Sequence, residues 1–144
     1  MKKSFTNILL IFLLSVIVIG CSRKKDKFLN KNFHSLTTKY NFLFNGNNLY
    51  AEGLIDLENE VKENFWGLLP IEKFKYYDID DEDRETNFTR SEEKATLAIQ
   101  KHSMNVDGKE RNPIMDQAYF LLGKSRYFDN RFIPALEAFN YILY

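Results

Sequence analysis

The sequence has few of the residues on which small proteins build disulfides or metal sites. Its 144 residues include one cysteine, two histidines, three prolines and six glycines. One cysteine excludes an internal disulfide, and together with two histidines it cannot supply the usual tetrahedral zinc site. Low proline and glycine content excludes collagen-like and Pro/Gly-rich disordered chains. The 20 basic residues balance 20 acidic ones, which argues against a nucleic-acid-binding protein.

Long apolar runs are also scarce, and the longest lies near the start of the chain. Ile8 to Ile19 is apolar except for Ser15 and follows a basic head of Lys2 and Lys3. Twelve residues rise about 18 Å as a helix, well short of a hydrocarbon core of about 30 Å. The run is therefore typical of a signal peptide and not of a membrane-spanning helix. We expect residues 1–20 to be a leader.

The only cysteine follows this run directly, in the sequence Val18-Ile19-Gly20-Cys21. This pattern resembles the bacterial lipobox, which implies cleavage before Cys21 and acylation of both its thiol and its new amino group. The lipid on Cys21 is then the one expected covalent group, with no metal and no other cofactor. Several acyl chains anchor a protein more firmly than one. The alternative is that Cys21 is an ordinary small apolar residue at the end of the run.

Residues 21–31 are expected to form the lipidated tether. Ser22 and the basic run that follows it favour the periplasmic face of the outer membrane, since surface-exposed lipoproteins of the Bacteroidota tend to carry acidic residues there. The basic run is also compatible with a plain solvated tether, or with contact to anionic head groups.

Apolar spacing predicts a divergent helical hairpin, followed by an aromatic segment, in residues 32–77. Apolar side chains recur at spacings of three and four, which predicts one core-facing helix face containing Phe33, Leu36, Tyr40, Leu43 and Phe44. Asn45-Gly46-Asn47 predicts a turn, and the apolar positions from Leu49 to Val61 predict a second helix that reaches about Asn64. A turn this short would make the two helices antiparallel neighbours.

An acidic segment, residues 78–90, is predicted to be a loop. Asp78, Asp80 and Glu82 fall at alternate positions, as calcium ligands do. However, Asp83 and Thr89 stand where an EF-hand loop needs glycine and glutamate, so a solvated loop is the better interpretation.

Residues 91–111 are predicted to be a helix and a turn. Thr89-Arg90-Ser91-Glu92 matches a capping box, and Ala95, Ala98 and Ile99 follow on one helical face. Asp107-Gly108 marks the turn. Asn112-Pro113 then predicts a cap and the first turn of a helix that reaches about Phe128, and a last helix begins at Phe132. No segment shows sustained period-two alternation, so the fold class is all-α.

The segment 112–144 carries the most specific pattern, that of a tetratricopeptide repeat, a helix-turn-helix unit of about 34 residues. Counting from Asp116, the matching places are Tyr119 (fourth), Leu122 (seventh), Gly123 (eighth), Asn130 (fifteenth, in the turn), Ala135 (twentieth) and Phe139 (twenty-fourth). Small residues at Gly123 and Ala135 would let two helices approach closely, with larger side chains filling the space beside them.

Two places depart from the repeat pattern, and a generic helical hairpin is the alternative. Arg126 stands where tyrosine is usual, and Ile142 where alanine is usual. Tyr144 falls inside the unit, so we expect an amino-terminal fragment of a longer α-solenoid, truncated at its C-terminus, with the apolar face of its last helix exposed.

Several stretches together resemble a known family. They are the lipobox, HSLTTKYNFLFNGNNLYAEG (His34–Gly53), ENFWGLLPIEKF (Glu63–Phe74), AIQKHSM (Ala98–Met104) and the repeat from Asp116. They are similar to the SprE/PorW-type tetratricopeptide-repeat lipoproteins of gliding motility and type IX secretion in the Bacteroidota. The stretch Tyr40–Gly46 is the distinctive part of this resemblance.

The resemblance implies a non-enzymatic protein-interaction scaffold, lipid-anchored in the outer membrane, whose partners are protein components of the secretion and gliding machinery. Neither a nucleic acid nor a small-molecule substrate is expected. Two other functions stay open: a lipoprotein of the barrel-assembly machinery, and a glycan-binding helical lipoprotein of a nutrient importer.

Few side chains are candidates for function. No nucleophile–base pair, phosphate loop or carboxylate pair is recognisable, so no catalytic residue is predicted. His34 and His102 are far apart in the sequence, which favours structural roles. Trp66 is a possible partner contact, although packing between repeats is the commoner use. Arg126 is a possible groove contact, although a snorkelling side chain is the commoner interpretation.

Overall fold

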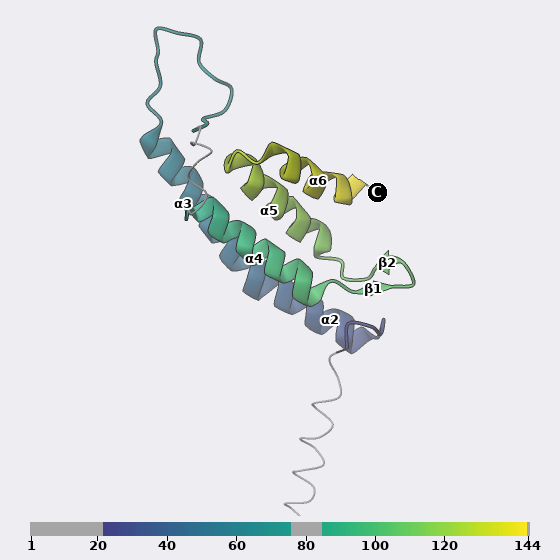
Figure 1. The fold of residues 1–144 in the computed structure, drawn as a ribbon. Coiled ribbons are helices and arrows are strands. Elements are labelled where there is room, and N and C mark those ends of the chain that lie inside the picture. Colours follow the sequence, from purple (N-terminus) through teal and green to yellow (C-terminus); the bar gives the residue numbers. More distant parts are fainter. Residues whose placement is uncertain (1–21, 76–84, 144) are drawn as a thin grey trace, which may run out of the picture.

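The computed structural model describes residues 22–75 and 85–143 (Figure 1). These residues are mostly helical, which confirms the all-α class. The elements in chain order are α2 (Phe28–Thr37), the π-helical segment η1 (Thr38–Leu43), α3 (Phe44–Glu60), α4 (Asn87–His102), β1 (Asn105–Val106), β2 (Lys109–Glu110), α5 (Met115–Phe128) and α6 (Phe132–Leu143).

The first three elements form one continuous helix of 33 residues, about 50 Å long. The turn predicted at Asn45-Gly46-Asn47 is therefore wrong, and with it the hairpin expected in residues 32–77. Gly46 is buried within α3, where an added Cβ would lie 2.7 Å from Leu121 Cδ2. The glycine serves a close approach between helices and makes no turn. Asn47, predicted as a cap, donates its side-chain amide to the Leu43 carbonyl one turn earlier.

Of the apolar face predicted from spacing, only Leu43 is buried in the core, and Phe33, Leu36, Tyr40 and Phe44 are exposed. Asn30, His34 and Thr38 are buried, whereas Tyr40 and Phe44 are 64% and 58% exposed. The π-helical segment adds one residue to a turn, so that the buried face resumes five residues later at Leu43 and continues to Gly46 and Leu57. The Thr38 hydroxyl donates to the His34 carbonyl at 2.7 Å, an extra bond at the start of this wider turn.

Helix α4 begins earlier than predicted. Its capping box joins Thr86 and Thr89: the Thr89 amide donates to Thr86 Oγ1 at 3.1 Å, and the Thr86 amide donates to Thr89 Oγ1 at 2.8 Å. The end of the predicted 78–90 loop is therefore helical, and its calcium-like carboxylates at 78, 80 and 82 lie outside the described residues. Ala95 and Ala98 are fully buried, in agreement with their predicted face.

The connection between α4 and α5 contains the predicted turn at Asp107-Gly108. Asp107 and Gly108 both have positive φ, 54° and 73°, and they close the short antiparallel pair of β1 and β2. The Glu110 carboxylate orders the next connection, because its Oε1 accepts the amides of Met104 and Asn112, each at 2.8 Å. Asn112 Oδ1 accepts the Ile114 amide, and α5 begins one residue later.

Successive helices pack side by side, with α3 against α4, α4 against α5, and α5 against α6 (Figure 1). Helix α5 ends at Phe128 and α6 begins at Phe132, as predicted, with Asn130 at φ 64° in the turn. Two apolar clusters form the core. One contains Leu43, Ala95, Ala98, Ala118, Leu121, Leu122 and Ala138, and the other contains Leu57, Phe88 and Phe128.

Candidate functional site

The residues of the repeat pattern lie at the contact between α5 and α6. A Cβ added to Gly123 would lie 2.6 Å from Phe139 Cδ1, so only glycine admits this ring. Leu122 and Ala135 are buried, and Tyr119 stacks on Tyr141. These side chains position α6 on α5.

Arg126, a candidate groove contact, is engaged inside the molecule. Its Nε donates to Glu92 Oε1 of α4 at 2.8 Å, and its Nη1 donates to the Pro134 carbonyl at 3.1 Å. Arg131 also pairs with Glu92. The arginine at the place where the repeat pattern has tyrosine therefore ties α5 to both α4 and the start of α6.

Cys21, the predicted lipidation site, and the leader before it lie outside the described residues. Among the helices that the structure describes, none combines the length and apolar character needed to cross a bilayer.

The two histidines, separated by 68 positions in the sequence, meet in the structure. His34 Nδ1 lies 2.8 Å from His102 Nδ1 in a buried contact between α2 and the end of α4. One ring must donate and the other accept, so at least the accepting ring is neutral in this arrangement. Burial, the neighbouring imidazole and the charges of Arg23 and Lys101 lower the pKa of His102 to about 4. Burial and Arg23 lower the pKa of His34 as well.

The histidine contact joins α2 to the end of α4 as part of a buried polar cluster. The two Nδ1 atoms face one another, and Asn112, which donates to the His102 carbonyl and to Thr38 Oγ1, closes the same polar cluster. Across residues 22–75 and 85–143, no three His, Cys, Asp or Glu side chains gather as a metal-binding group. Sequence reasoning missed the pair because no local pattern links α2 to the end of α4.

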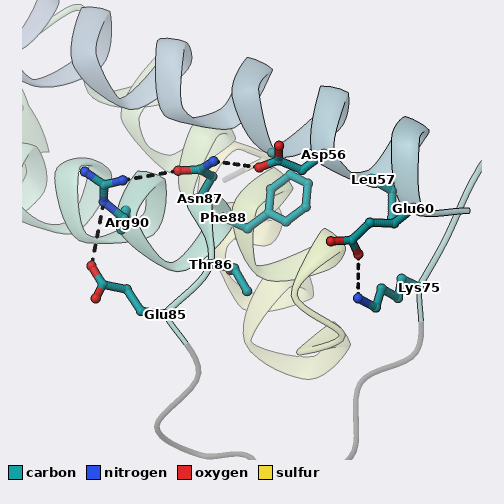
Figure 2. Close-up of a pocket in the computed structure, with 10 residues that line it drawn as sticks. Asp56, Leu57, Glu60, Lys75, Glu85, Thr86, Asn87, Phe88 and Arg90 are labelled. Atoms are coloured by element: carbon teal, nitrogen blue, oxygen red, sulfur yellow. Dashed lines mark hydrogen bonds and ion pairs between the residues drawn. The ribbon is translucent and has the colours of Figure 1, made fainter.

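A pocket of about 480 Å³ lies between α3 and the start of α4, with Phe88 among its lining residues (Figure 2). Its polar groups are paired with one another: Lys75 Nζ with Glu60 Oε2 at 2.5 Å, Asn87 Nδ2 with Asp56 Oδ2 at 2.8 Å, and Arg90 Nε with Glu85 Oε1 at 3.7 Å. Glu60 and Glu85 are thus each paired with a basic side chain, whereas Asp56 accepts from the neutral Asn87 amide.

The loop of residues 61–75, between α3 and the undescribed segment, is the candidate functional site. Figure 1 shows it at the end of α3 farthest from α2. Trp66 is 100% exposed. It therefore does not pack between repeats in this structure, which was the alternative to a partner contact. The loop's other exposed apolar side chains are Phe65, Leu68, Leu69 and Ile71.

The start of this loop is held in shape by hydrogen bonds and ion pairs. Asn64 accepts the Trp66 amide through Oδ1 and the Gly67 amide through its carbonyl, each at 3.1 Å. Lys73 lies 3.6 Å from Glu58 and 3.3 Å from Glu63. Lys73 thus connects the end of the loop to its start, and the exposed apolar side chains lie on the closed loop between them.

The end of the loop is packed against α5 and α6. The Phe74 ring stacks on Phe132 with centroids 5.7 Å apart and meets Tyr127 edge-on at 5.5 Å. Asn130 donates to the Lys75 carbonyl at 3.0 Å. An apolar cluster that is exposed yet fixed at its base is typical of a protein-binding site, because little ordering entropy remains to be lost on binding.

Comparison with protein-family models and with curated proteins finds no match for this chain.

Proposed function

We propose that this chain is a non-enzymatic scaffold lipoprotein of the outer membrane that acts in type IX protein secretion and gliding motility, with the 61–75 loop as a protein contact. The observation that carries the interaction role is the exposed apolar loop tip around Trp66 on a fixed base. A tryptophan of this kind contributes about 2 kcal/mol or more to binding when a partner buries it. The assignment to secretion follows from the sequence resemblance.

In this proposal α5 and α6 form a tetratricopeptide-type unit. The supporting features are the glycine contact at Gly123, the turn at Asn130 and the buried Ala135. The outer face of α6 is apolar and exposed at Ile133 and Leu136, a surface of the kind that a neighbouring repeat covers in such arrays. The lipid on Cys21 would hold the scaffold at the membrane.

The test is made in the organism that carries the gene, with three strains: a deletion, a double variant Trp66→Ser/Leu68→Ser, and a control variant Ile55→Ser. Ile55 is also an exposed apolar residue, but it lies on α3 outside the loop. We expect the deletion and the double variant to lose exported proteins from the medium and accumulate them in the periplasm. Immunoblots should show unchanged amounts of the double variant, and Ile55→Ser should export normally.

Other outcomes would contradict the proposal. Normal export with depleted outer-membrane barrels in the deletion strain would indicate the assembly machinery. If export and barrels are both normal and growth on one polysaccharide fails, the glycan-binding function is correct. If the deletion abolishes export but the double variant does not, the loop is not the contact.

A further inference from the structure

The solvent-facing side of α2, η1 and the first residue of α3 carries an apolar stripe that nothing in the described structure covers. Its members, at successive spacings of four, three, four and four, are Leu29, Phe33, Leu36, Tyr40 and Phe44, and all five are exposed. They extend over about 22 Å of helix. Two phenylalanines and a tyrosine give the stripe the aromatic character of interfacial helices.

The amphipathic character of α2 is inverted relative to a helix on the surface of a globular protein. Such a helix buries an apolar face and exposes a polar one. In α2 the buried residues are Asn30 and His34, and the first residue of η1, Thr38, is buried too. Helix α4 packs on α2, η1 and α3, and the five side chains of the stripe stay exposed outside that contact. The stripe is therefore available to a flat partner on the outside of the molecule.

The charge around the stripe is of one sign. Between residues 22 and 44 the lysines at 24, 25, 27, 31 and 39 are present, whereas Arg23 donates to the Gln100 carbonyl of α4 and lies on that side of the helix. The one acidic residue in this range, Asp26, lies 3.4 Å from Arg111 and is neutralised. Lys39 Nζ lies 5.3 Å from the centre of the Tyr40 ring, so one positive charge is placed within the stripe itself.

This combination favours an anionic lipid surface as the occupant. An exposed aromatic stripe with basic neighbours is the pattern of helices that lie in the head-group region of a bilayer. Each basic residue near an anionic membrane contributes about 1 kcal/mol of attraction. The second half of the same helix is acidic, with Glu52, Asp56, Glu58 and Glu60, so the attraction is confined to the end that holds the stripe.

We propose that α2 and η1 lie along an anionic bilayer surface, with the stripe in the head-group region. This binding mode goes beyond the scaffold function and depends neither on acylation of Cys21 nor on the partner of the 61–75 loop. It places α4 on the side of the long helix away from the lipid. The membrane contact therefore leaves α4 free to pack α5 as the structure has it.

The experiment places the photo-cross-linker p-benzoylphenylalanine at Phe33, Tyr40 or Phe120 of the full chain in its own cells. Each is an exposed aromatic residue, so folding is preserved, and Phe120 on α5 is the control away from the stripe. We expect lipid adducts, identified by mass spectrometry, at Phe33 and Tyr40 and not at Phe120. Adducts to another protein or to a second copy, or no adduct, at both stripe positions would overturn the proposal.

A second arm tests the charge. The full chain is reconstituted into vesicles of phosphatidylcholine alone or with one-third phosphatidylglycerol. The adduct yield at Tyr40 should rise at least about threefold with the anionic lipid, and equal yields would overturn the electrostatic part. The double variant Trp66→Ser/Leu68→Ser should keep its lipid adducts, so failure of the scaffold function and failure of lipid binding are distinguishable.

Discussion

The contact between His34 and His102 predicts that acid destabilises the protein. In the folded state burial and nearby positive charge lower the pKa of His102 to about 4, whereas an unfolded histidine has a pKa of about 6.5. The unfolded chain thus binds more protons between these values. The stability from the neutral pair is fully present above pH 6.5 and is lost as the pH falls from 6.5 towards 4.

The magnitude follows from the two pKa values. Between pH 7 and pH 5, His102 alone should reduce the free energy of unfolding by about 2 kcal/mol. His34 adds to the effect in the same direction, since its pKa is lowered too. Its Nε2 has no hydrogen-bond partner among the described residues, so a proton placed there would have no acceptor.

Urea unfolding of the protein and of the variant His102→Asn at pH 7, 6 and 5 measures this effect. The variant is less stable at pH 7, but its free energy of unfolding should fall less between pH 7 and pH 5. Carboxylates titrate in both proteins and cancel in the comparison. An NMR titration of the His102 ring in the unmodified protein should give a pKa near 4. Equal pH slopes, or a ring pKa near 6.5, would refute the reasoning.

Two further substitutions test the packing of α5. Gly123→Ala should lower the free energy of unfolding by about 1–3 kcal/mol, because the new methyl group meets the Phe139 ring and overpacking outweighs the better helix propensity of alanine. Arg126→Met should cost about 1–3 kcal/mol, because the half-buried Glu92 and the Pro134 carbonyl lose a charged donor. Denaturant unfolding measures both changes.

Each of these substitutions has a matched control. Gly67→Ala adds a methyl group 3.6 Å from the nearest atom, an ordinary contact, and should change stability by less than about 0.5 kcal/mol. Arg90→Met breaks an exposed pair with Glu85 and an exposed hydrogen bond to Asn87 Oδ1, and should cost less than about 1 kcal/mol. A test variant that is no less stable than its control would contradict the packing described for α5.

The candidate site could be predicted from the sequence only in part. Trp66 stands out in composition, and its neighbours Phe65 and Leu68 mark an apolar cluster. The position of the loop that carries this tryptophan is set by the stacking of Phe74 on Phe132 and by the hydrogen bond from Asn130 to the Lys75 carbonyl. Those contacts join segments far apart in the chain, and no local pattern encodes them.

Three local features were predicted correctly from the sequence, although the capping box predicted at Thr89-Arg90-Ser91-Glu92 in fact joins Thr86 and Thr89. The turn at Asp107-Gly108 needs two residues that tolerate positive φ, and the α5–α6 connection needs Asn130 for the same reason. Glycine at position 123 was also interpreted correctly as a close helix contact. Each of these depends on residues within one turn or one hairpin, so sequence spacing is enough to find them.

Tertiary contacts decided the rest. Gly46 looks like a turn residue in the sequence, yet its missing Cβ makes room for Leu121, from a helix 75 residues away. The apolar spacing through Tyr40 and Phe44 predicts a core face, yet packing buries His34 and Thr38 instead, because the partners of these polar groups, His102 and Asn112, come from other segments. A buried polar face is stable only when distant groups complete its hydrogen bonds, and only the folded chain brings them together.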